Sequence, residues 1–260
     1  MASFSARSAI AVLIMVALCV LAPAQQPAAT APATTTATRP VRPPVPRSTT
    51  QPAQRGPAHA QFMARVARGN IDLVFFGDSI TAGWANNAVW KKYYAPRNGA
   101  NFGIGGERTQ HILWGILNGE VDGIAPKVVV LMIGTNNTGE NSAAEIAEGI
   151  TLIVKTLRQK LPASKVLLLG VFPRGNANDP RRAKIAGINK TIAGLDDGKT
   201  VRYLDIGPKF LAEDGSLPKE IMPDLLHLSL KGYQIWADAM EPLLTELMGP
   251  VPATAPAAPN

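Results

Sequence analysis

Ile71-Asp72-Leu73-Val74-Phe75-Phe76-Gly77-Asp78-Ser79 joins a β-branched and aromatic run to a polar turn. The run predicts a buried strand over 71–76 that ends at Gly77. Open α/β sheets carry their sites where strands end. Ser79 is therefore expected at the edge of a sheet, with its hydroxyl available for chemistry. The alternative is a plain turn, because Gly, Asp and Ser are common turn residues.

Strands and helices alternate along the rest of the chain. The strands are expected at 71–76, 100–102, 127–133, 165–171 and 201–204, and the helices at 60–68, 87–94, 109–117, 143–160, 180–195 and 229–247. This alternation is typical of parallel βαβ units, and strands that are apolar throughout indicate a sheet covered on both faces. The sequence therefore predicts an α/β protein, a three-layer α/β/α sandwich with a parallel sheet of about five strands.

The first 24 residues have the pattern of a secretory signal peptide. Arg7 supplies a positive charge, Ala9 to Leu21 is apolar, and Ala22-Pro23-Ala24 fits a small-residue cleavage site. The apolar stretch is short for a membrane span, so we expect no stable membrane insertion after cleavage and a secreted or periplasmic protein. A retained N-terminal anchor is the alternative, and a lipoprotein attached through Cys19 is disfavoured by Leu18.

Composition divides the remaining chain into three parts. Residues 25–58 are rich in Pro, Ala and Thr and contain Arg39, Arg42, Arg47 and Arg55 but no acidic residue, which predicts a disordered linker. Residues 249–260 predict a disordered tail. Residues 59–248 suit one α/β domain.

Cysteine and charge exclude several classes of protein. Cys19 is the only cysteine, so the cleaved chain would contain no disulfide, thiol nucleophile or cysteine metal site. The net charge of +7 comes partly from the linker. The domain has no cluster of Lys and Arg interleaved with aromatic residues, so we expect no nucleic-acid partner.

Residues suited to acyl transfer occur where predicted strands end and before the last predicted helix. Ser79 is the candidate nucleophile, and His227 is a base whose ordinary pKa allows proton transfer near neutral pH. Asp224 lies three residues before His227, a spacing that brings a carboxylate beside the imidazole in a turn. Taken singly, His227 could be a structural histidine and Asp224 a capping or turn residue.

Donors for an oxyanion hole are also present. Gly103 lies in a glycine-rich turn whose backbone N–H can approach a substrate, Asn136 offers a side-chain amide, and the N–H of Ser79 is a third donor. Asn137 is an equally good amide by composition. The alternative roles are helix capping for the amide and a tight turn for the glycine.

The sequence lacks the motifs that are typical of several other classes of enzyme. The chain has no His-x-x-x-His or His-Glu-x-x-His pattern, so we expect no metal. It has neither Gly-x-Gly-x-x-Gly nor a Walker A sequence, so we expect no nucleotide cofactor. No Gly-x-Ser-x-Gly elbow of the α/β-hydrolases occurs.

The chain resembles the SGNH hydrolases, also called the GDSL esterase/lipase family. The matching blocks are Gly77-Asp78-Ser79-Ile80, Asn101-Phe102-Gly103, Gly134-Thr135-Asn136-Asn137 and Asp224-x-x-His227. Within the family it is most similar to the platelet-activating-factor acetylhydrolase catalytic-subunit branch, through the runs 101–106, 113–120 and 171–175. The resemblance implies a flavodoxin-like sheet and a metal-free serine esterase. It also implies a triad of Ser79, Asp224 and His227, with oxyanion donors at Ser79, Gly103 and Asn136.

These observations favour a secreted serine carboxylester hydrolase that removes small acyl groups. The resemblance to the acetylhydrolase branch implies acetyl as the acyl group. The signal peptide and linker favour a substrate outside the cytoplasm, such as an acetylated polysaccharide. One alternative is a lipid-directed esterase or thioesterase of the same fold. A second is a carbohydrate-binding module without catalysis.

Overall fold

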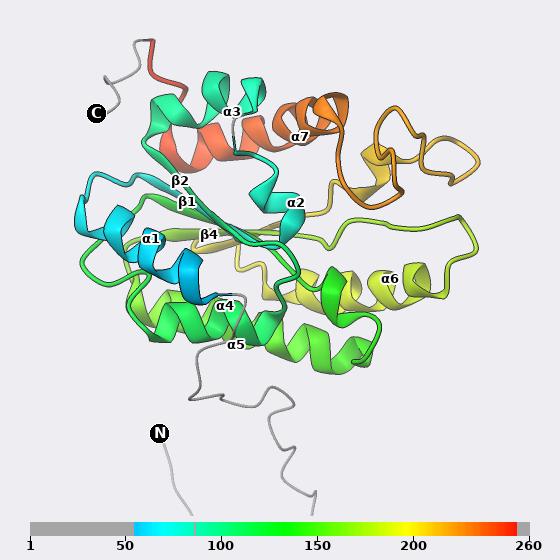
Figure 1. Ribbon diagram of the computed structural model, residues 1–260, viewed down its shortest axis with the longest axis horizontal. Helices are drawn as coiled ribbons and strands as arrows, with labels where there is room; N and C mark the ends of the chain where they lie inside the picture. Colours follow the sequence, from blue (N-terminus) through cyan, green and yellow to red (C-terminus); the bar gives the residue numbers. More distant parts are fainter. Residues whose placement is uncertain (1–54, 86, 254–260) are drawn as a thin grey trace, which may run out of the picture. The chain divides into compact units, whose positions relative to one another are not determined.

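A parallel sheet of five strands forms the centre of the structure, a computed structural model that describes residues 55–85 and 87–253 (Figure 1). The predicted signal peptide, most of the predicted linker and the end of the predicted tail lie outside these residues. The strands lie in the order β2-β1-β3-β4-β5. Their bounds are Leu73–Gly77 (β1), Gly99–Gly103 (β2), Val128–Met132 (β3), Lys165–Leu169 (β4) and Val201–Leu204 (β5). This arrangement confirms the predicted fold class.

Helices cover both faces of the sheet. Figure 1 places α1, α4, α5 and α6 on one face and α2, α3 and α7 on the other. Their bounds are Gly56–Ala67 (α1), Ser79–Ala82 (α2), Ala88–Tyr93 (α3), Thr109–Leu117 (α4), Ala143–Lys160 (α5), Pro180–Ile192 (α6) and Leu230–Met248 (α7). Among the described residues, no helix is long and apolar enough to cross a membrane.

The apolar run of β1 supplies both layers of core. Val74 and Phe76 belong to the buried cluster under α4, α5 and α6, whereas Leu73 and Phe75 belong to the cluster under α7. Successive side chains of a strand point to opposite faces, so a strand between two helical layers must be apolar at every position. This is why the run shows no alternation of polar and apolar residues.

Strand register brings the candidate site to one edge. Gly77 at the end of β1 pairs with Gly103 of β2 on one side and with Met132 of β3 on the other. The first three sequence blocks therefore leave the sheet side by side. The strand order reverses direction at β1, the position at which ligands bind in open α/β sheets.

The prediction of a disordered linker over 25–58 is wrong at its last residues. Helix α1 begins at Gly56, with Pro57 in its first turn, where proline is tolerated because its missing N–H has no helical partner. Arg55 is fully buried. The helix predicted over 180–195 is also shorter, since α6 ends at Ile192 and a 3-10 turn, Ala193–Leu195, follows.

Candidate active site

Ser79 is the first residue of α2, and Asp78 alone separates it from the end of β1. Asp78 caps this helix, and its Oδ1 accepts a hydrogen bond from the N–H of Ile80 at 3.0 Å. The hydroxyl of Tyr233 on α7 donates to the carbonyl oxygen of Ile80 at 2.7 Å. At Gly77 a Cβ atom would lie 2.6 Å from the carbonyl oxygen of Met132. The turn is therefore tightly packed, and it holds Ser79 at the sheet edge.

Ser79, His227 and Asp224 form one line of hydrogen bonds. Ser79 Oγ lies 2.8 Å from His227 Nε2, and His227 Nδ1 lies 2.6 Å from Asp224 Oδ2. The other oxygen, Asp224 Oδ1, accepts from the backbone N–H of Leu226 at 3.1 Å and of His227 at 2.7 Å. This line brings together residues 148 positions apart. It gives the serine a base, and the base an orienting carboxylate.

The environment of Asp224 favours its charged form. Partial burial acts to raise the pKa of Asp224, but hydrogen bonds from the His227 ring and from the backbone outweigh burial and hold the pKa below its ordinary value. The side chains of His227 and Asp224 are 45% and 54% exposed. The carboxylate is therefore ionised at neutral pH at an open surface, where it can stabilise an imidazolium.

The turn that carries Asp224 and His227 contains a strained residue. Leu225 has a φ of 59°, in the left-handed region that a leucine rarely occupies. The N–H of Gly175, in the loop after β4, donates to the Leu225 carbonyl oxygen at 2.8 Å. Such conformations persist where surrounding contacts fix them, and they cluster at active sites.

Two of the expected oxyanion donors, Gly103 and Asn136, lie at the same edge but already have partners. The N–H of Gly103 donates to Asn101 Oδ1 at 3.0 Å, and Asn101 Nδ2 donates to the Thr81 carbonyl oxygen at 3.0 Å. Asn136 Nδ2 donates to the Glu107 carbonyl oxygen at 2.9 Å. An amide nitrogen carries two hydrogens, so this bond orients Asn136 and leaves its second N–H for another acceptor.

Asn137 occupies a different environment from Asn136. It is buried, its Oδ1 accepts from the Thr109 N–H at 3.1 Å, and its Nδ2 donates to Gln110 Oε1 and Asn141 Oδ1. These bonds tie the start of α4 to the segment after β3. By composition, the side-chain amides of Asn136 and Asn137 were equally good candidates for an oxyanion donor. In the structure their environments differ, since Asn136 is half-buried and Asn137 is enclosed by its hydrogen-bond partners.

Asp78 combines full burial with an unpaired oxygen. Its Oδ2 has no hydrogen-bond partner among the described residues. Burial raises the pKa of Asp78 to about 7, although the hydrogen bond from Ile80 and the nearby charge of Arg174 act in the opposite direction. A buried carboxyl group without a full set of partners favours its neutral form. The residue beside Ser79 therefore titrates near neutral pH.

Arg174 is a site neighbour that reasoning from strand ends missed. It follows β4, and its Nη1 donates to the Thr135 carbonyl oxygen at 3.2 Å and to Thr135 Oγ1 at 3.1 Å. Thr135 directly precedes Asn136. The available signal was the run 171–175, which carried part of the family resemblance but suggested no role for the arginine.

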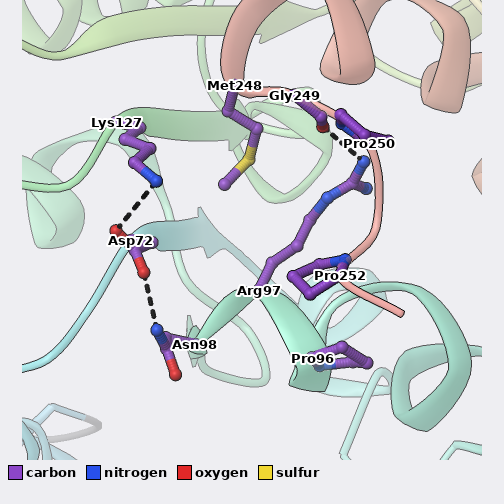
Figure 2. Close-up of a pocket in the computed structure, with 9 residues that line it drawn as sticks. All are labelled: Asp72, Pro96, Arg97, Asn98, Lys127, Met248, Gly249, Pro250 and Pro252. Carbon is purple, nitrogen blue, oxygen red and sulfur yellow. Dashed lines mark hydrogen bonds and ion pairs between the residues drawn. The ribbon is translucent and has the colours of Figure 1, made fainter. Parts of the chain in front are cut away.

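A hollow lies at the opposite edge of the sheet from Ser79 (Figure 2). It has a volume of about 250 Å³ and contains Asp72, Arg97, Asn98 and Lys127 among its lining residues. Asn98 Nδ2 donates to Asp72 Oδ2 at 2.6 Å, Lys127 Nζ lies 3.6 Å from Asp72 Oδ1, and Arg97 Nη2 donates to the Gly249 carbonyl oxygen at 2.9 Å. The polar groups of this hollow thus bind one another.

Residues 55–85 and 87–253 contain no group of three or more His, Cys, Asp and Glu side chains arranged to hold a metal ion. The chemistry available at the Ser79 edge is a hydroxyl nucleophile next to an imidazole, with amide donors nearby. This combination suits acyl transfer.

Comparison with known proteins gives the class. Residues 75–235 match the model of the GDSL-like lipase/acylhydrolase family. The chain therefore belongs to this family, and it is a serine ester hydrolase.

Individual proteins of similar sequence agree with this family assignment. The chain is 37% identical over 191 residues to the platelet-activating factor acetylhydrolase IB subunit alpha1 of Homo sapiens, covering 73% of this chain and 82% of the relative. It is 36% identical over 195 residues to the alpha2 subunit of Rattus norvegicus, covering 75% and 85%.

Solved structures share the fold. A GDSL-like lipase from Bacteroides thetaiotaomicron superposes with a TM-score of 0.56 at 19% identity, covering 76% of this chain and 92% of that one. A catalytic mutant of an acetylxylan esterase from Geobacillus stearothermophilus superposes with a TM-score of 0.53 at 17% identity, covering 70% and 95%.

Proposed function

We propose that the chain is a carboxylester hydrolase that removes acetyl groups by a Ser79–His227–Asp224 triad. The hydrogen-bonded line from Ser79 Oγ through the imidazole to the Asp224 carboxylate carries this proposal. The names of two sets of similar proteins, acetylhydrolase and acetylxylan esterase, support acetyl as the acyl group.

The reaction follows from the positions of the three side chains. Ser79 Oγ attacks the ester carbonyl carbon while His227 Nε2 takes the hydroxyl proton. The imidazolium then donates through Nδ1 to Asp224, which stabilises its charge. His227 returns the proton to the leaving alcohol, and the acyl group stays on Ser79. Water activated by His227 hydrolyses this acyl-enzyme and releases acetate.

Backbone and amide donors stabilise the tetrahedral intermediate. The second N–H of Asn136 and the N–H of Ser79 bind the developing oxyanion. The N–H of Gly103 joins them when the substrate oxygen shares or displaces its bond to Asn101. Loss of one such donor typically lowers the rate by ~10²–10³.

The open position of the triad favours an acetylated carbohydrate as the substrate. With His227 and Asp224 about half exposed, an acetyl group that projects from a polymer can reach Ser79 without entering an enclosed pocket. The alternative is a lipid ester, and the names of the relatives from Homo sapiens and Rattus norvegicus support it. Comparing acetylated xylan with acetyl and octanoyl esters separates the two, because a lipid-directed enzyme gains rate with acyl or alkyl length.

The decisive variant is Ser79→Ala. We expect it to abolish turnover of p-nitrophenyl acetate and covalent labelling by an organophosphonate, with an unchanged circular dichroism spectrum. Ser142→Ala, which changes a serine that caps α5, serves as the matched control and keeps its activity. Activity retained in Ser79→Ala would refute the triad. A wild type that neither hydrolyses esters nor takes the label would favour the carbohydrate-binding module.

The proposal includes secretion through the signal peptide at 1–24. Mass spectrometry of the chain from the extracytoplasmic fraction should find an N-terminus at Gln25. A full-length chain confined to the cytoplasm would contradict this part of the proposal and leave the reaction untouched.

A further inference from the structure

A buried ionic cluster lies next to the loop after β2. Nη1 of Arg55 donates to Glu107 Oε2, while its Nε and Nη2 donate to the two oxygens of Glu120, the Nε bond measuring 2.9 Å. The side chains of Arg55, Glu107 and Glu120 are all 0% exposed. The guanidinium thus joins the segment before α1 to two carboxylates that follow β2 and α4.

The surrounding residues leave space for this arginine. Gly115 on α4 faces the guanidinium, and a Cβ atom there would lie 2.6 Å from Arg55 Nη2 and closer still to Nε. His59, one turn along α1, places Nδ1 2.8 Å from Glu120 Oε1. The ring of Phe62 lies 5.8 Å from the guanidinium carbon. Arg55 is therefore a built-in part of the domain.

A gain in folding stability alone does not explain why these charged residues are buried together. Buried ion pairs lose their hydration, and apolar residues of similar volume often stabilise a protein as well or better. The desolvation is visible at Glu107, where burial raises the pKa to about 7 against the opposing effect of Arg55. What an ionic cluster adds over apolar packing is a fixed direction for each group.

Glu107 connects the cluster to the candidate oxyanion hole. Its backbone carbonyl oxygen accepts the bond from Asn136 Nδ2 at 2.9 Å. Its backbone N–H donates to the Ile104 carbonyl oxygen at 3.3 Å, which closes the four-residue turn that directly follows Gly103. Its carboxylate Oε1 is buried without a hydrogen-bond partner among the described residues. Within the described part of the chain, the Arg55 guanidinium therefore anchors this carboxylate by itself.

We propose that Arg55 is a positioning residue for the oxyanion hole. The guanidinium fixes the Glu107 side chain, the Glu107 carbonyl fixes one N–H of Asn136, and the second N–H is thereby aimed at the substrate oxygen. This inference rests on the proposed function, which makes Asn136 an oxyanion donor. It also assigns a role in catalysis to a residue outside the four sequence blocks of the family.

A double-mutant cycle of Arg55→Met and Asn136→Ala tests the coupling, with p-nitrophenyl acetate as substrate and organophosphonate labelling to count active sites. We expect Arg55→Met to lower kcat per active site by roughly 10- to 100-fold with little change in KM, since it misplaces a donor whose full loss costs ~10²–10³. In the Asn136→Ala background the same change should have almost no further effect on kcat, because interactions on one path are not additive.

A second variant keeps the test valid if Arg55→Met does not fold. Glu107→Gln retains the backbone and the shape of the side chain but replaces the charge-assisted bond to Arg55 with a weaker one. It should lower kcat in the same direction by a smaller factor, again only while Asn136 is present. Arg97→Met is the matched control, because Arg97 is a buried arginine paired with Glu241 at the opposite edge of the sheet. It should lower the unfolding midpoint and leave kcat per active site unchanged.

The outcomes separate this inference from the proposed function. An unchanged kcat per active site in Arg55→Met, or an equal fold loss in the wild-type and Asn136→Ala backgrounds, would overturn the positioning role alone. An unchanged kcat in Asn136→Ala would overturn both that role and the assignment of Asn136 as a donor. Activity retained in Ser79→Ala would overturn the triad, whatever the cycle gives.

Discussion

Asp78→Asn should weaken the dependence of stability on pH. In the folded protein burial raises the pKa of Asp78 from 3.8 to about 7. Between these values the folded state holds a proton that the unfolded state has lost. A rise in pH disfavours the state that binds more protons, which here is the folded state. The free energy of unfolding therefore falls as the pH rises. Asparagine does not titrate, so the variant lacks this contribution.

The size of the effect follows from the two pKa values. A difference of about 3 in pKa, at about 1.4 kcal/mol each, gives on the order of 4 kcal/mol lost once the pH exceeds the folded pKa. Part of this loss has already occurred at about pH 5, which lies above the unfolded pKa. The expected loss between about pH 5 and about pH 8 is therefore roughly 3 kcal/mol for this one group.

Urea unfolding over this pH range measures the effect, with the fluorescence of the buried Trp84 and Trp236 as the signal. The difference in unfolding free energy between Asp78→Asn and wild type should shift in favour of the variant by roughly 3 kcal/mol from about pH 5 to about pH 8. Thr81→Val is the matched control, since it changes a buried hydroxyl of the same turn and removes no titrating group. Parallel curves for Asp78→Asn and wild type would refute the assignment of a raised pKa to Asp78.

Two further predictions concern the site. Gly103→Ala should lower kcat for p-nitrophenyl acetate at least 10-fold, because its Cβ would lie 2.7 Å from the backbone carbon of Thr81 and would push β2 away from α2. Gly105→Ala, whose Cβ would meet no atom within 4 Å, should retain activity, and equal losses in the two variants would contradict the steric argument. Asp224→Asn should lower kcat by roughly 10²-fold or more, because an amide no longer holds the imidazole in its useful tautomer, yet by less than the ~10⁴ of a buried triad carboxylate. Asp238→Asn on the exposed side of α7 is its control, and unchanged kcat in Asp224→Asn would exclude that carboxylate from the triad.

The fold could be predicted because its signals are local. The β1 and β3 runs are apolar at every position, and each has the length of a strand between two helical layers. The strand order β2-β1-β3-β4-β5 carries no such signal, since it depends on which strands pair across long connections. Once β1 is placed between β2 and β3, the first three sequence blocks fall together without further assumptions.

The candidate triad could be selected from the sequence because its residue types are chemically restricted. The chemistry requires a serine, a histidine and a carboxylate near that histidine. Few positions in the sequence meet these requirements together. The bond from the Gly103 N–H to Asn101 Oδ1 could not be anticipated in this way. It depends on a side-chain orientation at the end of β2, and no pattern of residue types encodes that orientation.

The error at Arg55 has a different physical cause. Proline, alanine and threonine dominate the preceding stretch, and an arginine within it suggests a solvated chain. The burial of Arg55 is determined by Gly115, Glu107 and Glu120, which lie far along the sequence and supply the space and the opposite charges. The boundary of a domain is therefore fixed by tertiary partners, and composition alone placed it a few residues too late.

Several hydrogen bonds that position the candidate site come from residues outside the candidate triad and the candidate oxyanion donors. The capping carboxyl of Asp78 fixes the turn of Ser79, Gly175 holds the strained Leu225 between Asp224 and His227, and the Glu107 carbonyl orients Asn136. In the candidate triad, the side chains of His227 and Asp224 are about half exposed. At such an open position, we expect hydrogen bonds from neighbouring residues to hold the candidate site residues in place. For this reason a substitution at Arg55 tests the proposed mechanism alongside substitutions in the candidate triad, whereas Asp78→Asn tests the electrostatics of the turn that carries Ser79.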